Sequence, residues 1–399
     1  MKRIVIIGGG AAGMAAAIRA AETPGNRVTL LERQGRVGRK LLATGNGRCN
    51  LTNIGADVEN YHGADPLFVL PALKKYPPAA VLDFFAGLGL RTVTEYGGRV
   101  YPMSDHAGSV LDVLRLALER RGVEVVTGAA VTDVKPGFTV AWDGGSAAAD
   151  QLIVACGGCA GGKLGGVTDG YAILASLEHT RTALYPALTT LRTAPEYPRA
   201  LKGIRADARA AILRDKTVLA EDRGDVLFME TGLSGTAIFS LSRAVSTGGE
   251  GLTAALDFFP DAEETELLDD LKARRTRWPQ LPANQLLTGT VQSRLGLMLC
   301  RYAGIGGGET AGALSDAALR KLGRAMKNFL LPVTGVGGFD AAQVTAGGVR
   351  TAEFDPETLQ SRRVPGLYAC GEVLDVDGDC GGYNLQWAWA SGLLAGELR

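Results

Sequence analysis

The chain opens with a strand, a helix and a second strand. Residues 3–7 and 27–31 are short apolar runs rich in β-branched side chains, the pattern of parallel strands that are buried on both faces. Between them, residues 14–22 are rich in alanine and predict a helix that ends before Pro24 and Gly25. The opening segment therefore predicts a βαβ unit, the building block of an α/β fold with a parallel sheet.

The rest of the first domain continues this alternation of helices and strands. The apolar spacing predicts helices at 67–75, 79–88 and 110–121, strands at 123–127 and 151–155, and a hairpin at 131–142. A strand at 366–370 and a helix at 384–398 resume the pattern much later in the chain. We therefore expect a first domain that is built from two separate stretches of sequence.

Two insertions account for the middle of the chain. Residues 185–259 carry short alternating segments, which indicate a β-rich part, whereas from 262 to 329 the apolar positions follow helical spacing. Glycine-punctuated strands return at 333–349. The boundaries that we expect are 1–184 plus 350–399 for the first domain, 185–261 plus 330–349 for the β-rich domain and 262–329 for the helical domain.

Length and charge narrow the class of protein. The chain has 399 residues, enough for two to three domains with buried cores. Its 42 Lys and Arg residues balance 42 Asp and Glu residues, so the net charge is zero. This balance argues against a protein that neutralises many nucleic-acid phosphates or binds an anionic membrane surface. We expect a small-molecule substrate and neither a nucleic acid nor a membrane as partner, and the oligomeric state stays open.

Cysteine and histidine usage excludes two further kinds of site. Six cysteines in a chain of this length do not form a secreted disulfide framework, so we expect reduced thiols and a cytoplasmic location. An apolar run at 4–18 resembles a signal peptide, but four glycines interrupt it. The three histidines lie in unrelated contexts without metal-ligand spacing, so we expect no metal site.

Glycine is unusually frequent in this chain, and one glycine-rich stretch fits the sequence fingerprint of dinucleotide-binding proteins. The chain has 55 glycines, about twice the usual share. Residues 8–13 read Gly-Gly-Gly-Ala-Ala-Gly and fit the pattern G-x-G-x-x-G between a strand and a helix. Gly8 allows the tight turn, Gly10 lets the backbone approach a pyrophosphate, and Gly13 lets the helix pack closely on the strand.

An acidic residue completes this fingerprint. Glu32 follows the last glycine by nineteen residues, where its carboxylate can accept hydrogen bonds from the hydroxyls of an adenosine ribose. With Ala12 in the turn, these residues predict a bound dinucleotide whose phosphates face the helix N-terminus. We find no second nucleotide motif: residues 306–311 follow a helical pattern, and Leu164 stands after residues 157–163 where a P-loop needs Ser or Thr.

Longer blocks of sequence resemble one family. They are Gly-Asn-Gly-Arg-Cys-Asn-Leu-Thr-Asn at 45–53, Leu-Ser-Gly at 233–235, Val-Thr-Ala-Gly-Gly-Val at 344–349, Gly-Glu-Val-Leu-Asp-Val-Asp-Gly at 371–378 and Gly-Gly-Tyr-Asn-Leu-Gln-Trp-Ala at 381–388. With these blocks the chain resembles, over essentially its whole length, the bacterial BaiN-like (YhiN-like) FAD-dependent oxidoreductases, a family that also contains aminoacetone oxidase. The resemblance implies FAD as cofactor and an α/β fold, in which a discontinuous Rossmann-type FAD-binding domain carries an inserted β-barrel-like domain and an inserted helical domain.

The resemblance also implies which residues line the cofactor. In such flavoproteins a late strand ends near the ribityl and phosphate groups, and the N-terminus of the last helix faces the pyrimidine end of the isoalloxazine ring, where the helix dipole stabilises reduced flavin. The residues at these two places are Gly371, Glu372, Asn384, Leu385 and Gln386. Similar flavoproteins contact adenine near Val131 and the pyrophosphate or ribose near Ala155.

A polar stretch after the second strand adds further candidate contacts with the cofactor. Arg33, Lys40 and Thr44 are spaced to reach phosphate or ribityl oxygens. Asn46 and Arg48 belong to a polar loop that we place beside the isoalloxazine ring. Arg48 is expected to offset negative charge that develops on the flavin or the substrate.

Three residues are candidates for substrate anchoring or proton donation, namely Arg48, Tyr101 and Tyr383. A tyrosine suits this role because the reduction of a conjugated C=C bond needs a proton on the carbon next to the one that takes hydride. Cys156 and Cys159 form a C-x-x-C pair, which would make a disulfide reductase if it were a redox dithiol. The family usually has small residues at these places, so we favour two cysteines that serve as small residues.

We expect a reaction in which flavin N5 exchanges hydride with a small organic substrate. The resemblance favours an NAD(P)H-fed reductase of a C=C bond conjugated to a ketone, as in dehydro-bile acids, with NAD(P)H as a transient electron donor. An alternative is an FAD-dependent oxidase of amines such as aminoacetone, which passes electrons to oxygen. From another class, a flavin-containing protein that binds or modifies tRNA stays open.

Overall fold

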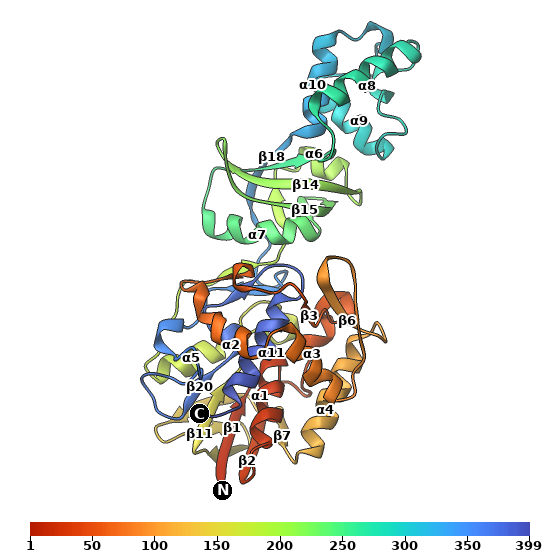
Figure 1. The fold of residues 1–399 in the computed structure, drawn as a ribbon. Helices are drawn as coiled ribbons and strands as arrows, with labels where there is room; N and C mark the ends of the chain where they lie inside the picture. The colour runs from red at the N-terminus through yellow and green to blue at the C-terminus, as the bar shows by residue number, and fades with distance from the viewer. The chain divides into compact units, whose positions relative to one another are not determined.

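A parallel sheet of five strands forms the centre of the first of two units. The computed structural model describes residues 1–399 and divides into Met1–Tyr185 with Ala342–Arg399 and Pro186–Ala341. In the first unit the strand order is β20 (Leu367–Ala369), β11 (Gln151–Val154), β1 (Lys2–Ile7), β2 (Asn26–Glu32) and β7 (Glu124–Thr127), all parallel (Figure 1). The predicted α/β fold with a Rossmann-type sheet is confirmed.

Six helices belong to this unit: α1 (Ala11–Ala21), α2 (Leu70–Lys75), α3 (Pro78–Gly87), α4 (Ala107–Arg120), α5 (Asp169–Ser176) and α11 (Tyr383–Ala395). Small side chains let α1 and α11 pack closely (Figure 1). Gly392 of α11 and Gly396, which directly follows this helix, face the backbone of Ala12 and Ala16 in α1, at distances that leave no space for a Cβ atom. This packing fixes the last helix against the helix that follows the fingerprint turn.

Replacing Gly392 with alanine is expected to destabilise the first unit. A Cβ atom on Gly392 would lie 2.4 Å from the backbone oxygen of Ala12, and overpacking of this kind costs about 1–3 kcal/mol. The matched control is Gly87→Ala at the end of α3, where a Cβ atom meets nothing within 4 Å. Chemical denaturation should show a lower unfolding midpoint for Gly392→Ala alone, and equal midpoints for the two variants would contradict this packing.

Three smaller sheets complete the first unit. They are β3 (Thr52–Asn53) with β6 (Arg99–Pro102) and β5 (Thr92–Thr94), β4 (Tyr61–His62) with β21 (Asp377–Gly378), and β8 (Val131–Lys135) with β9 (Thr139–Trp142) and β10 (Gly145–Ala148). The predicted hairpin at 131–142 is confirmed as β8 and β9. The third strand, β10, was not predicted, because its glycine, serine and alanines carry no alternating apolar signal.

A closed antiparallel barrel of six strands forms the second unit. Its strand order is β13 (Leu191–Thr193), β16 (Gly232–Ser234), β15 (Thr217–Met229), β14 (Arg205–Arg214), β17 (Leu252–Asp257) and β18 (Phe329–Val336). Its helices are α6 (Glu196–Ala200), α7 (Thr236–Gly248), α8 (Glu264–Arg277), α9 (Ser293–Tyr302) and α10 (Asp316–Lys327). Two short strands of the chain, β12 (Tyr185–Ala187) and β19 (Val344–Ala346), pair with each other outside the barrel. The inserted barrel that we expected is confirmed.

One apolar core runs from the barrel into the helices of the second unit. Leu256 and Phe329 of the barrel belong to the same buried cluster as Leu271 of α8 and Leu322 of α10. A separate helical domain at 262–329 therefore stays a prediction, since the structure divides the chain only at 185/186 and 341/342. None of the helices combines the length and the apolar character that a membrane crossing requires.

The assignment of 185–259 to short strands is wrong for two segments, the helices α6 and α7. Helix α7 lies in this stretch, and its buried residues Ile238, Leu241 and Val245 follow helical spacing. Serine and threonine, which are common in turns, obscured this spacing in the sequence.

A buried histidine links two segments of the first unit. His179 Nδ1 lies 2.8 Å from Glu353 Oε2, and His179 Nε2 lies 2.9 Å from Ser361 Oγ. The imidazole also stacks on Phe354. Burial lowers the pKa of His179, against the opposing effect of the hydrogen bond with Glu353. For Glu353, burial opposes ionisation, but hydrogen bonds from Thr180 and His179 outweigh it and lower its pKa.

The free energy of unfolding is expected to fall as the pH drops below 6.5. His179 is neutral in the folded chain because its pKa lies below the ordinary value of 6.5. Below that pH only the unfolded chain takes up the proton. The contribution of His179 to the free energy of unfolding is therefore complete above pH 6.5 and is lost below it, at up to about 1.4 kcal/mol per pH unit. Denaturation at a series of pH values tests this, from pH 7.5 down to about 4.5, the ordinary pKa of Glu353. The free energy of unfolding of His179→Gln should fall less steeply with decreasing pH than that of the wild type. Equal slopes for the two chains would contradict it.

Candidate functional site

The turn between β1 and α1 has a crowded side and an open side. Gly8 has a φ of +110°, and a Cβ atom on it would lie 2.4 Å from the backbone oxygen of Ala155. A Cβ atom on Gly13 would lie 1.8 Å from the backbone oxygen of Gly8. Gly10 precedes α1 without a side-chain cap, and a Cβ atom on it would meet nothing within 4 Å. The turn therefore fits a pyrophosphate, because Gly10 opens the N-terminus of α1 to phosphate oxygens.

Glu32 is held beside this turn at the end of β2. Its Oε2 accepts a hydrogen bond from the backbone N–H of Gly9 at 2.8 Å, and its Oε1 accepts one from that of Gln34 at 2.7 Å. The backbone N–H of Ala129 donates to the Glu32 carbonyl at 2.9 Å, which brings the segment before Val131 alongside. The carboxylate is fixed in place, and its other lone pairs fit the hydroxyls of a ribose.

A second acidic residue, Glu372, lies beside the fingerprint turn, shortly after the end of β20. Glu372 Oε2 lies 2.9 Å from Lys40 Nζ, and Glu372 Oε1 accepts a hydrogen bond from the backbone N–H of Thr345 at 2.8 Å. Gly371 has a φ of +75°, and a Cβ atom on it would lie 2.8 Å from the Cβ of Ala12. The structure thus brings together four of the predicted cofactor residues, Ala12, Lys40, Gly371 and Glu372.

Two other predicted residues make contacts within the protein. Arg33 forms an ion pair with Asp169 at 2.9 Å. The Thr44 hydroxyl donates to the backbone oxygen of Leu41 at 2.7 Å. Contacts of Arg33 and Thr44 with the cofactor stay predictions.

The polar loop after Thr44 reaches the start of α11. Gly45 and Asn46 adopt the left-handed backbone conformation, with φ of 57° and 56°. The side-chain oxygen of Asn50 is buried without a hydrogen-bond partner, and a Cβ atom on Gly382 would lie 3.0 Å from it. Helix α11 begins directly after Gly382 without a side-chain cap. An unsatisfied acceptor beside an uncapped helix N-terminus fits the edge of a flavin ring, which carries an N–H between two carbonyl groups.

The side chains at the start of α11 bind the protein itself. Asn384 donates from Nδ2 to the backbone oxygen of Gly378 at 2.7 Å. Gln386 accepts from the Thr52 hydroxyl at 2.7 Å and donates to the backbone oxygen of Tyr76 at 2.8 Å. Leu385 packs against the apolar core. The backbone N–H of Gln386 also has a partner, the Gly382 carbonyl at 3.0 Å, and the contacts of these three residues with the cofactor stay predictions.

Two of the three predicted catalytic residues stack on each other. The Arg48 guanidinium lies 3.9 Å from the centre of the Tyr101 ring and forms ion pairs with Glu95 and Asp105. Hydrogen bonds to these two carboxylates raise the pKa of Arg48. Burial raises the pKa of Tyr101, although Arg99 and Arg48 act in the opposite direction. Two carboxylates thus pair with Arg48, and its role in offsetting charge on the flavin or substrate stays a prediction.

Tyr383, the third of these residues, is the first residue of α11 and is bound by β4. The Tyr61 hydroxyl donates to the backbone oxygen of Tyr383 at 3.1 Å. The next residue of β4, His62, has its Nε2 2.8 Å from Asp379 Oδ1. The sequence analysis missed this pair, because His62 and Asp379 are 317 residues apart and neither stands in a recognised motif. The pairing of β4 with β21 brings them together.

All six cysteines are free thiols. Cys156 Sγ lies 3.6 Å from the backbone oxygen of Ile7, and burial raises the pKa of Cys156 to about 12. Cys159 Sγ lies 3.8 Å from the Thr345 hydroxyl, and burial raises its pKa as well. A redox dithiol needs an accessible thiolate, so these environments favour cysteines that serve as small residues.

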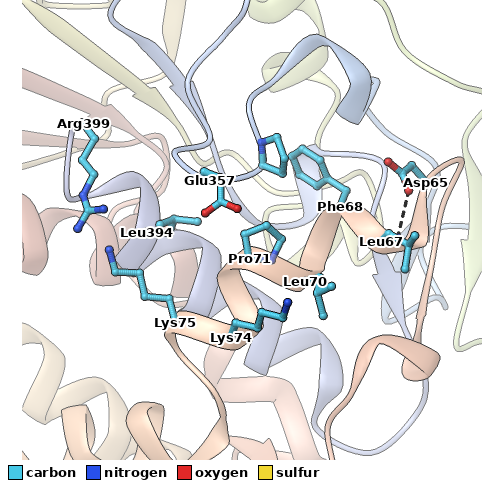
Figure 2. A pocket seen from close by; sticks show the side chains of 11 residues that line it. Asp65, Leu67, Phe68, Leu70, Pro71, Lys74, Lys75, Glu357, Leu394 and Arg399 are labelled. Carbon is cyan, nitrogen blue, oxygen red and sulfur yellow. Dashed lines mark hydrogen bonds between the residues drawn. The ribbon is translucent and has the colours of Figure 1, made fainter.

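A cavity of about 570 Å³ lies elsewhere on the first unit (Figure 2). It is lined by charged and apolar side chains, namely Asp65, Leu67, Phe68, Leu70, Pro71, Lys74, Lys75, Pro356, Glu357, Leu394 and Arg399. None of the predicted cofactor or catalytic residues lines it, so we assign it no part in the cofactor site.

Comparison with known proteins connects this site to a family. The family model described as "HI0933-like protein Rossmann domain" matches residues 2–398. A 3-dehydro-bile acid delta(4,6)-reductase of Clostridium scindens is 43% identical over 404 residues, which cover 100% of this chain and 98% of that protein. Ribosomal RNA dihydrouridine synthases of Escherichia coli (strain K12) and Haemophilus influenzae are 30% and 28% identical, and each match covers 97% of this chain and at least 95% of the relative.

These comparisons bear on two expectations from the sequence. They confirm the resemblance to FAD-dependent oxidoreductases over essentially the whole chain. They do not confirm that the chain lacks a nucleic-acid partner, since two relatives are named for ribosomal RNA. The chain belongs to the HI0933-like Rossmann family of FAD-dependent oxidoreductases.

Proposed function

We propose that this enzyme is an NAD(P)H-fed reductase of C=C bonds conjugated to a ketone, with 3-dehydro bile acids as the substrate class. The observation that carries the proposal is the 43% identity, over the full length of both chains, to a protein named 3-dehydro-bile acid delta(4,6)-reductase. The site supports it, because the first unit offers a place for a dinucleotide and polar groups at the expected edge of the flavin.

The residues that would hold FAD follow from the contacts described above. They are the backbone of Gly8, Gly10 and Gly13 for the pyrophosphate, Glu32 for the adenosine ribose, Lys40 and Glu372 for the ribityl or phosphate oxygens, and Asn50 with the first turn of α11 for the ring edge. Bound FAD supplies the centre that takes hydride from NAD(P)H and passes it to the substrate. In this proposal Val131 contacts the adenine, and Ala155, whose backbone oxygen lies close to Gly8, contacts the pyrophosphate or ribose.

NAD(P)H is proposed to bind transiently, without a second dinucleotide fold. The other glycine-rich stretch, at 306–311, follows helix α9 rather than a strand. A fingerprint needs a strand before its glycines to aim the phosphates at the next helix, and this stretch lacks one.

Product analysis tests the proposed reaction. Purified holoenzyme is incubated without oxygen with NADH or NADPH and a 3-oxo-4-ene bile acid, and the products are identified by mass spectrometry. We expect consumption of the nicotinamide that depends on the enone, together with a saturated 3-ketone that gains two hydrogen atoms. Nicotinamide consumption without any saturated product would overturn the proposed substrate class.

Reduction of uridine in ribosomal RNA is a second candidate function. It is favoured by the two relatives named ribosomal RNA dihydrouridine synthases, and it too reduces a C=C bond conjugated to a carbonyl. The zero net charge of the chain weighs against it, because tight RNA binding relies on phosphate neutralisation. Incubation of the holoenzyme with unmodified ribosomal RNA in place of the enone distinguishes the two candidates, because only the second function produces dihydrouridine.

A further inference from the structure

His62 and Asp379 form an accessible acid–base pair beside the N-terminus of α11. His62 Nε2 lies 2.8 Å from Asp379 Oδ1, and the two side chains are 35% and 38% exposed. We propose that His62, oriented by Asp379, donates the proton in the reduction of the substrate C=C bond. This inference rests on the proposed function and adds a catalytic residue that no sequence motif marks.

The structure holds Asp379 firmly in place for this role. Its backbone N–H donates to the Asn60 carbonyl at 3.0 Å, and its Oδ2 accepts from Asn60 Nδ2 at 3.2 Å. Its backbone oxygen accepts from Asn384 Nδ2 at 3.2 Å. Two backbone contacts and one carboxylate contact thus hold Asp379, and its Oδ1 remains to orient the imidazole of His62.

The pair lies next to the part of the site that fits the flavin ring edge. Asn384, which binds the Asp379 carbonyl, is the second residue of α11. Tyr61, the neighbour of His62 in β4, binds the first residue, Tyr383. The first turn of this helix, together with Asn50, is the proposed site of the ring edge. A substrate that stacks on the ring would therefore lie close to His62.

The chemistry of the proposed step needs a donor of this kind. Hydride adds to the β-carbon of the enone, the π electrons move toward the carbonyl, and a proton must then reach the α-carbon. The imidazolium of His62 gives that proton and becomes neutral, and half-exposure lets it regain a proton from water. The reductant is NAD(P)H acting through the flavin. Because Nε2 is bound to Asp379, Nδ1 is the nitrogen without a protein partner.

Four other candidate donors are less suited to the step. His106 caps α4, since its Nδ1 accepts from the backbone N–H of Gly108. Both nitrogens of His179 are engaged in a buried network. Burial raises the pKa values of Tyr61 and Tyr101, so neither phenol gives up its proton readily. Of the three histidines, His62 alone combines a carboxylate partner with solvent access.

Other titratable groups lie around the pair. Asp375 and Asp377 are buried on the same segment as Asp379. Asp375 accepts a hydrogen bond from the backbone N–H of Ala64, two residues after His62. On the neighbouring elements, Tyr61 and Tyr383 face the pair from β4 and α11.

The test uses His62→Gln and Asp379→Asn in the FAD-loaded enzyme. Glutamine can still donate an N–H to Asp379, but it cannot supply a proton. Reduction of the flavin by NAD(P)H should change little, whereas reoxidation by the enone should slow by about 10²–10⁴-fold in His62→Gln. In Asp379→Asn, which removes the carboxylate that orients the imidazole, reoxidation by the enone should also slow, by less than in His62→Gln, while reduction by NAD(P)H should change little.

A measurement without turnover accompanies the kinetics. The chain has three histidines, so their C2 protons can be assigned by NMR with single variants. Addition of the saturated 3-ketone product to the oxidised holoenzyme should shift the His62 resonance and leave that of His106 in place. His106→Asn, which keeps an N-cap acceptor on α4, is the control and should match the wild type in both half-reactions.

Each outcome bears on the inference. The inference would be overturned, with the proposed function intact, if the enone reoxidised the flavin of His62→Gln or of Asp379→Asn at the wild-type rate. A His62 resonance that does not shift when the product is added would overturn it as well. A wild-type enzyme whose reduced flavin does not react with the enone would instead overturn the proposed function, and the inference with it.

Discussion

Gly10→Val is expected to abolish FAD binding while the apoprotein stays folded. In the protein alone, a Cβ atom on Gly10 meets nothing within 4 Å, and the backbone there is extended with φ of −82°. Valine is therefore compatible with the fold, at a cost of about 1 kcal/mol or less for this N-cap position. The added side chain lies where the pyrophosphate must approach the N-terminus of α1. We expect the affinity for FAD to fall by at least about 100-fold, or about 2.8 kcal/mol.

Titration of the apoprotein with FAD, followed by flavin fluorescence, measures this loss, and chemical denaturation measures the folding. Gly13→Val is the matched comparison. A Cβ atom on Gly13 would lie 1.8 Å from the backbone oxygen of Gly8, so this variant should lose folding stability as well as FAD. If Gly10→Val bound FAD as the wild type does, the pyrophosphate could not lie at this turn.

Glu32→Ala should weaken FAD binding and destabilise the apoprotein together. The carboxylate of Glu32 accepts hydrogen bonds from the N–H groups of Gly9 and Gln34. Removing it leaves both donors without that acceptor, at about 1–3 kcal/mol for each donor that stays buried. The ribose hydroxyls lose their acceptor too, so we expect an affinity for FAD that is lower by about 100-fold, in line with the loss of charge-assisted hydrogen bonds.

Glu32→Gln is the control for Glu32→Ala. The amide keeps one acceptor oxygen and the size of the side chain, so its losses should fall between those of the wild type and of Glu32→Ala. The same denaturation and titration measurements apply. Full FAD affinity in Glu32→Ala would show that this carboxylate supports the turn only and does not bind the ribose.

The fold and the dinucleotide turn could be predicted because their signals are local. The glycines of 8–13 and the acidic residue Glu32 have fixed spacings around one strand and one helix, and such spacings can be recognised in the sequence. The ion pair between Lys40 and Glu372 lies between residues far apart in the chain. Its two members were still predicted separately, each from its own motif.

Three features of the site depend on contacts that the sequence does not display. Arg48 looked free to offset charge on the flavin, but folding brings Glu95 and Asp105 to it. Gln386 lies at the start of a helix that faces the site, yet its side chain turns to Thr52 and Tyr76. His62 gave no signal, since its partner Asp379 reaches it only through the pairing of β4 with β21. Side-chain partners across long sequence separations decide all three cases.

One anaerobic mixing experiment tests the central claim most directly. Holoenzyme that has been reduced with NAD(P)H is mixed in parallel with a 3-oxo-4-ene bile acid and with oxygen, and the return of the visible absorbance of oxidised flavin is followed. We expect the enone to restore oxidised flavin faster than oxygen does, with one saturated ketone formed per flavin. Rapid reoxidation by oxygen, no reaction with the enone, and reduction of the oxidised enzyme by aminoacetone would contradict the account and indicate an amine oxidase.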